Sequence, residues 1–288
     1  MQRPEVKDFF HAPSSTFSYV VWDPSTLKAA VIDSVLDYDA AAGRTAHDSA
    51  DSMITFVRAQ GLSVEWVIDT HVHADHLSAA PYMRAKLGGK LAIGEHIRMI
   101  QQTFGDLFNA GSGFARDGSQ FDHLFVDGER YMLGSIEATA MHTPGHTPAC
   151  MTHVIGDAAF VGDTLFMPDY GTARCDFPGG DAAALYRSIQ KIFALPDANR
   201  IFLCHDYKAP GREQFVHETT VAAQRHDNIH VHTGIGEAAF VAMRSARDAT
   251  LNMPQLILPA VQVNMRAGQL PPVEDNGMRY LKIPLDVI

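Results

Sequence analysis

Histidines and carboxylates gather at a few places in this sequence, and their spacing is typical of a metal site. His71, His73, Asp75 and His76 form the motif HVHADH. They directly follow residues 64–69, a short apolar run that we interpret as a buried strand. A loop after such a strand holds ligands rigidly, and imidazole and carboxylate groups bind zinc and iron. We therefore expect these side chains to converge on one or two metal ions.

Three more groups of the same kind follow expected strands. His146 lies in the turn sequence TPGHT, Asp163 in GDT, and His205 directly after an apolar run at residues 200–204. A lone loop histidine is more often a surface residue than a ligand. Repeated placement just past a strand end makes chance improbable, so we expect all three groups to join the first four in one site.

Strand-like and helical segments alternate along the chain and must position these groups. We expect strands at 15–22, 28–33, 64–69, 91–93, 130–133, 135–141, 150–155, 158–161 and 200–204, the last being the final strand. Helices are expected at 47–60, 79–87, 95–108, 181–193 and 237–249, with Asp181 as an N-cap. This order predicts an α/β protein with mixed sheets and outer helices. The character changes near residue 228, so we expect a domain over 1–228 and a C-terminal helical or irregular extension over 229–288 packed on it.

The composition limits the classes of function. The 288 residues carry 33 acidic and 23 basic side chains, a net charge of −10, which disfavours nucleic-acid or anionic-membrane partners. No apolar run approaches the roughly 18 residues of a membrane span, and the N-terminus shows no signal peptide. Cys150, Cys175 and Cys204 form no CxxC pair, which argues against disulfides and a cysteine-rich zinc site. We expect a soluble cytoplasmic protein with no nucleic-acid or membrane partner.

The order HxHxDH, TPGHT, GDT and a late histidine resembles the metallo-β-lactamase superfamily. The match runs from about Phe17 to Tyr207 and fills all seven ligand positions. It implies a four-layer αββα sandwich, with the metal site at one edge of the two sheets and the catalytic domain at 1–228. Fold alone does not settle the reaction, since this superfamily covers many.

A second resemblance indicates a more specific activity within this superfamily. The segment Arg174-Cys175-Asp176-Phe177 looks like the RTDF-type segment of the glutathione persulfide (sulfur) dioxygenase family, with Cys175 in place of Thr. HDY at 205–207 and VNMRAG at 263–268 are also similar to that family, in its bacterial type. The resemblance implies one Fe(II) per chain, held by His71, His146 and Asp163. It also implies oxidation of glutathione persulfide by O₂ to sulfite and thiol, and a homodimer.

The same resemblance assigns further roles. The residues around the iron that orient ligands or move protons would be His73, Asp75, His76 and His205. Arg174 and Tyr207 would bind the substrate, Arg174 by gripping a glutathione carboxylate with its planar fork. The alternatives are an ion pair between Arg174 and Asp176, and simple packing of Tyr207 beside the site. We expect Cys175 to be a structural replacement for Thr.

One other function stays open, and two more are disfavoured. In hydrolases of the glyoxalase II type, His73, Asp75, His76 and His205 bind metal directly in a site of two Zn²⁺ ions, and activated water cleaves a glutathione thioester. A non-catalytic metal-binding domain is disfavoured because no ligand position is missing, and a secreted β-lactamase because no export signal is visible. We expect the remaining histidines mostly at the surface or at helix ends, with His142 as a minor candidate for the site.

Overall fold

The computed structural model describes residues 3–287 and shows two main sheets and one small sheet. The first sheet has the order β1 (Glu5–His11), β2 (Thr16–Trp22), β3 (Lys28–Ile32), β6 (Ser63–Ile68), β8 (Lys90–Gly94) and β9 (His123–Phe125). The second has the order β10 (Glu129–Leu133), β11 (Ile136–His142), β12 (Met151–Ile155), β13 (Ala158–Phe160), β14 (Arg200–Phe202) and β15 (Glu218–Thr220). The small sheet consists of β5 (Arg44–Ala46), β4 (Val35–Asp39) and β7 (Leu77–Ser78).

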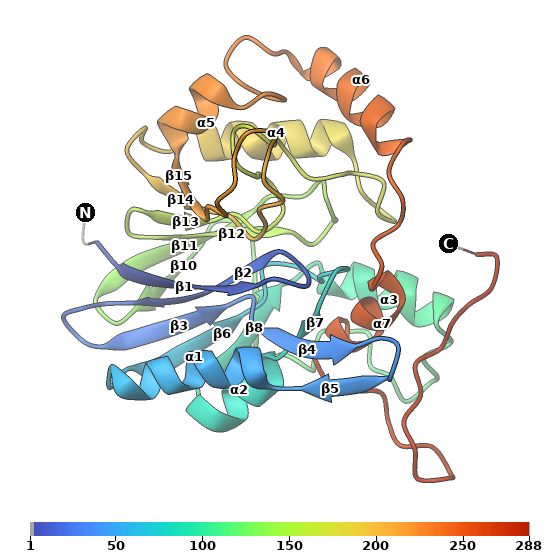
Figure 1. The fold of residues 1–288 in the computed structure, drawn as a ribbon. Helices are drawn as coiled ribbons and strands as arrows, with labels where there is room; N and C mark the ends of the chain where they lie inside the picture. The colour runs from blue at the N-terminus through green and yellow to red at the C-terminus, as the bar shows by residue number, and fades with distance from the viewer. Residues whose placement is uncertain (1–2, 288) are drawn as a thin grey trace.

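Seven helices lie in the described part of the chain. They are α1 (Asp48–Ala59), α2 (Ala80–Leu87), α3 (Ile97–Leu107), α4 (Ala182–Phe193), α5 (Val221–Asp227), α6 (Glu237–Asp248) and α7 (Ile257–Asn264). Helices α1, α2 and α3 pack on the outer side of the first sheet, and α4 and α5 on that of the second, with α6 against α4 (Figure 1). The architecture is the predicted four-layer αββα sandwich. None of the helices at residues 3–287 is long and apolar enough to cross a membrane.

Three apolar cores separate the four layers, because alternate side chains of a strand point to opposite faces of its sheet. On β6, Val67 packs toward the outer helices, whereas Trp66 and Ile68 enter the core between the sheets. On β13, Ala159 faces α4 and Phe160 faces the first sheet. Both sheets are thus buried on both faces, which explains the continuous apolar runs of their central strands.

The predicted elements are present, with ends within two residues of the expected ones, and Asp181 caps α4 by accepting from the Ala184 amide. The prediction that 200–204 is the final strand was wrong, because β15 follows it. This strand and β1 escaped notice since β15 is only three residues long and β1 is a half-exposed edge strand without an apolar run.

Two histidines expected near the surface are buried instead. His153 is fully buried between the sheets, and His230 is 8% exposed, with Nδ1 accepting from the Thr172 amide at 3.1 Å. The three cysteines are buried and form no disulfide. His142 stacks on His96 and bonds through Nε2 to the Pro148 carbonyl, so these contacts occupy it outside the site.

Candidate metal centre and substrate pocket

Four loops at strand ends bring the predicted site residues together. The loop after β6 carries the HVHADH motif, and the β11–β12 turn, the loop after β13 and the loop after β14 supply the rest. We call the seven residues the metal cluster: His71, His73, Asp75, His76, His146, Asp163 and His205. All except Asp75 are at least nine-tenths buried.

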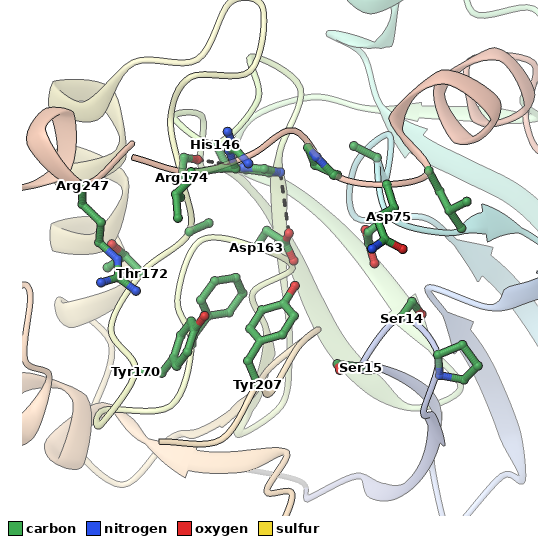
Figure 2. A pocket seen from close by; sticks show the side chains of 18 of the residues that line it. Ser14, Ser15, Asp75, His146, Asp163, Tyr170, Thr172, Arg174, Tyr207 and Arg247 are labelled. Carbon is green, nitrogen blue, oxygen red and sulfur yellow. Dashed lines mark hydrogen bonds and ion pairs between the residues drawn. The ribbon is translucent and has the colours of Figure 1, made fainter. Parts of the chain in front are cut away.

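Asp163 lies at the centre of the metal cluster. Its Oδ2 atom is 3.8 Å from Nε2 of His71. The same atom is 3.6 Å from Nε2 of His146, a contact visible in Figure 2. Its Oδ1 atom is 3.3 Å from Nε2 of His205, which is also 3.4 Å from Oδ2 of Asp75. One carboxylate therefore faces histidines on two sides, as a ligand of one metal ion or a bridge between two requires.

Several polar atoms of the cluster are buried without a hydrogen-bond partner among the described residues. They are Nε2 of His71, Nδ1 of His73, Nε2 of His76, Nε2 of His205 and Oδ1 of Asp163. Leaving such atoms unsatisfied costs about 1–3 kcal/mol each, so an arrangement of this kind needs a reason. The ligand atoms of His71, His146 and Asp163 lie within 4.8 Å of one another, and those of His73, Asp75 and His76 form a second such group. This donor set fits a metal ion.

The electrostatics of the cluster favour metal-binding protonation states. Burial lowers the pKa of His71 and of His73 well below the usual value, so both imidazoles are neutral and keep a lone pair for a metal. Burial also acts to lower the pKa of His205, but the carboxylates Asp163 and Asp75 raise it above its usual value.

A carboxylate that we did not identify from the sequence orients the second histidine. Asp33 Oδ1 lies 3.0 Å from Nε2 of His73 and accepts from the Thr70 amide at 2.7 Å. Its Oδ2 accepts from the Thr70 hydroxyl at 2.9 Å. The bond to Asp33 leaves Nδ1 of His73 for a ligand, as partners of metal-binding histidines commonly do. Asp33 could have been identified from its position directly after β3, the strand that pairs with β6.

A pocket of about 530 Å³ opens beside the metal cluster (Figure 2). Asp75, His146 and Asp163 line it together with Tyr170 and Tyr207. Tyr207 stacks on His205, with ring centres 5.5 Å apart. The pocket therefore exposes part of the cluster to a small molecule and has aromatic walls.

Three arginines line this pocket, and they differ in what holds them. Arg174 donates to the Asp176 carboxylate at 2.5 and 2.6 Å and to the Asn252 carbonyl at 2.6 Å, so the ion pair considered above is present. Arg244 is buried and paired with Asp248 at 2.6 Å.

The third arginine is Arg247, which is not among the site residues predicted from the sequence. Among the described residues its guanidinium has no ion-pair or hydrogen-bond partner, and it lies 6.0 Å from the centre of the Tyr170 ring. It projects from α6 toward Thr172 in the pocket (Figure 2). No local pattern marks it, because only the packing of α6 brings it there.

Fold and site together define the class of protein. The model of the metallo-β-lactamase superfamily matches residues 11–205, more than half of the chain. The chain belongs to this superfamily.

Comparison with individual proteins shows which members of the superfamily this chain is similar to. The chain is 58% identical to a probable metallo-hydrolase of Burkholderia pseudomallei, over 98% of this chain and 99% of that one. It is 46% identical to Glyoxylase B2 of Dictyostelium discoideum, over 99% and 98%. It is 31% identical to the mitochondrial persulfide dioxygenase ETHE1 of Mus musculus, over 93% and 90%. The crystal structure of ETHE1 from Myxococcus xanthus superimposes with a TM-score of 0.72 at 28% identity, covering 92% of this chain and 100% of that one. The two ETHE1 matches support the persulfide dioxygenase family within the superfamily.

Proposed function

We propose that this protein is a non-haem iron(II) dioxygenase that oxidises glutathione persulfide, or a similar low-molecular-weight persulfide, to sulfite and thiol. The observation that carries the proposal is the group of His71, His146 and Asp163, in a chain similar to ETHE1. Two of the three, His146 and Asp163, line the pocket. Iron(II), when bound there, supplies open positions for O₂ and the persulfide sulfur.

The chain's own residues have distinct parts in this proposal. His71 and His146 would hold the iron through Nε2, and Asp163 through its carboxylate. His73, Asp75, His76 and His205 would surround it, and burial of the cluster keeps competing water away from the reacting sulfur. Tyr207, beside His205, would present its hydroxyl to the substrate.

The anionic end of the substrate would meet Arg247. Arg174 remains a candidate for substrate binding, but its donors already serve Asp176 and Asn252. Its carbonyl oxygen accepts from Nδ1 of His146 at 2.8 Å, which positions that ligand. We therefore assign the glutathione carboxylate to Arg247 and a positioning role to Arg174.

A dinuclear zinc hydrolase of the glyoxalase II type is the second candidate. The unpartnered nitrogens of His73, His76 and His205 favour it, because they offer ligands for a second ion beside Asp163. The names of two relatives, a probable metallo-hydrolase and Glyoxylase B2, point the same way. Two zinc ions, if held by these residues and Asp163, would supply an activated water for cleavage of the thioester.

Metal content and oxygen uptake separate the two candidates. We expect protein purified from iron-supplemented cells without added zinc to hold one iron per chain and to consume O₂ with glutathione persulfide. His71→Ala should lose both the iron and the uptake. Two zinc ions per chain, with thioester cleavage and no O₂ uptake, would overturn the dioxygenase proposal.

A cytoplasmic homodimer is also part of this proposal. The C-terminal tail exposes apolar side chains, with Met278 55%, Ile283 68% and Leu285 78% accessible, and such surface favours association. Light scattering on the purified protein tests the dimer directly.

A further inference from the structure

A second pocket lies close to the active-site pocket, and two hydrogen-bonded side chains join them. Ser14 lines the active-site pocket beside Asp75. Its Oγ atom lies 2.6 Å from Nδ1 of His11, and His11 lines the second pocket, of about 360 Å³, together with Asp48 and Ser49. The Ser14–His11 pair therefore connects the two pockets through one contact.

The β1–β2 hairpin fixes this pair. His11 is the last residue of β1 and Thr16 the first of β2, and Ser15 between them has φ 55°, in the left-handed region. Ser14 Oγ lies 2.7 Å from Oγ1 of Thr16, which is fully buried and 3.3 Å from Oδ2 of Asp75. Ser14 thus has one partner on the side of the metal cluster and one on the side of the second pocket.

Either candidate reaction must release protons from the active-site pocket. Oxidation of a persulfide follows RSSH + O₂ + H₂O → RSH + SO₃²⁻ + 2H⁺. Thioester hydrolysis at neutral pH yields a thiol, a carboxylate and one proton. A glutathione-sized substrate in the active-site pocket obstructs the direct way to bulk water, so a separate exit serves both reactions.

We propose that Ser14 and His11 carry protons from the active-site pocket to the second pocket. The Ser14 hydroxyl passes its proton to Nδ1 of His11 while its oxygen takes one from the active-site pocket. His11 then releases the proton on Nε2 to water in the second pocket. Oδ1 of Asp37, from β4, lies 3.5 Å from Nε2 and stabilises the transient imidazolium. After this release the ring carries its proton on Nδ1. Exchange with water in the second pocket returns the ring to its Nε2–H form, and rotation of the hydroxyl completes the reset.

The surroundings of His11 suit this role. Burial and the nearby His76 lower its pKa, while Asp37 and Asp75 act to raise it. The net lowering leaves a neutral imidazole at pH 7, which accepts a proton and passes it on. The side chain of His11 is 14% exposed and therefore meets solvent without being freely mobile.

Chemical rescue tests the relay. We expect His11→Ala to lower kcat by about tenfold in dilute buffer, less than the hundredfold or more that loss of a base at the reacting atom causes, with metal content and KM unchanged. Added imidazole, which fits the second pocket, should restore the rate. Ser14→Ala should show the same loss without rescue by imidazole, and Ser14→Thr should keep most of the rate. The matched control is His226→Gln, an exposed histidine that should leave the rate unchanged.

A measurement without turnover completes the test. In ¹⁵N spectra of histidine-labelled protein, Ser14→Ala should shift the Nδ1 signal of His11, because that nitrogen loses its partner. An unchanged His11 signal, or a His11→Ala rate that is normal or indifferent to imidazole, overturns the relay. The rate is measured on whichever reaction the protein catalyses, so failure of the dioxygenase proposal is a separate result.

Discussion

Each histidine of the proposed iron site gives one ring nitrogen to the protein and keeps the other for a ligand. Nδ1 of His71 lies 3.0 Å from the Thr70 hydroxyl, and Nδ1 of His146 bonds to the Arg174 carbonyl. These contacts fix both rings before any metal arrives, which reduces the ordering cost of binding. The other nitrogen of each ring, Nε2, is therefore the atom available to a metal ion.

A single residue, Arg247, is expected to bind the negatively charged end of the substrate. We expect Arg247→Gln to raise KM for glutathione persulfide about tenfold, equivalent to about 1.4 kcal/mol, with little change in kcat. The reason is that Arg247 contacts the unreactive end of the substrate. Steady-state oxygen uptake measures both constants.

The control for this substitution is Arg187→Gln. That arginine is exposed and forms its ion pair with Glu237 at 2.9 Å, so both constants should stay the same. If Arg247→Gln leaves KM unchanged while Arg174→Gln raises it with iron content intact, the carboxylate belongs to Arg174 after all.

At the scale of elements, the C-terminal segment helps to hold the metal-binding loop. Asn264, the last residue of α7, donates to the carbonyls of His73 and His76 at 2.9 and 2.8 Å. Its side-chain oxygen accepts from the Ser78 amide at 2.8 Å. One buried amide thus joins the middle of the loop that carries the HVHADH motif to its C-terminal end.

Asn264→Ala should therefore weaken metal binding as well as the fold. We expect the metal affinity to fall 10- to 100-fold and the free energy of unfolding by about 2 kcal/mol or more, since buried loop groups lose their partners. Competition with a chelator and urea unfolding measure the two effects. Asn276→Ala, in the exposed tail, is the control and should change neither. Unchanged metal affinity in Asn264→Ala would show that the loop keeps its shape without α7.

The central strands could be predicted from the sequence, whereas the edge strands β1 and β15 could not. Strand β13 is apolar throughout and β6 is apolar except for Ser63 and Glu65, because their central positions are buried on both faces, and site residues follow shortly after each strand. Strands β1 and β15 lie at sheet edges and owe their structure to pairing with β2 and β14. The proposed relay depends on β1, and the role of Asn264 depends on α7. Neither element was predicted from the sequence, so these contacts could not be predicted either.

At the scale of the whole molecule, the core between the sheets contains a histidine that makes stability depend on pH. Burial lowers the pKa of His153 to about 4, from 6.5 for an exposed histidine. Its Nδ1 lies 3.1 Å from the Tyr131 hydroxyl, and its ring meets Phe125. The folded protein thus holds this imidazole neutral inside an apolar layer.

The sign of the effect follows from proton binding. Between pH 6.5 and 4 the unfolded chain protonates His153 and the folded protein does not, so the stability present above pH 6.5 is lost as the pH falls. We expect this residue to remove about 3 kcal/mol over that interval. His153→Phe should flatten that part of the curve, measured by urea unfolding at several pH values. A curve parallel to that of the wild type would show that His153 is not the group responsible.

The types of side chain at the candidate metal site and the central strands that carry them could be predicted from the sequence alone. Strand-end placement identified all seven residues of the metal cluster, because a buried strand needs apolar residues and the loop after it is free to carry function. The partners of the individual side chains depend instead on how the elements pack together. The tertiary structure paired Arg174 with Asp176, brought Arg247 into the pocket from α6, set Asp33 behind His73 and joined Ser14 to His11. These contacts join residues whose partners depend on how loops and edge elements pack, and no local periodicity records that packing.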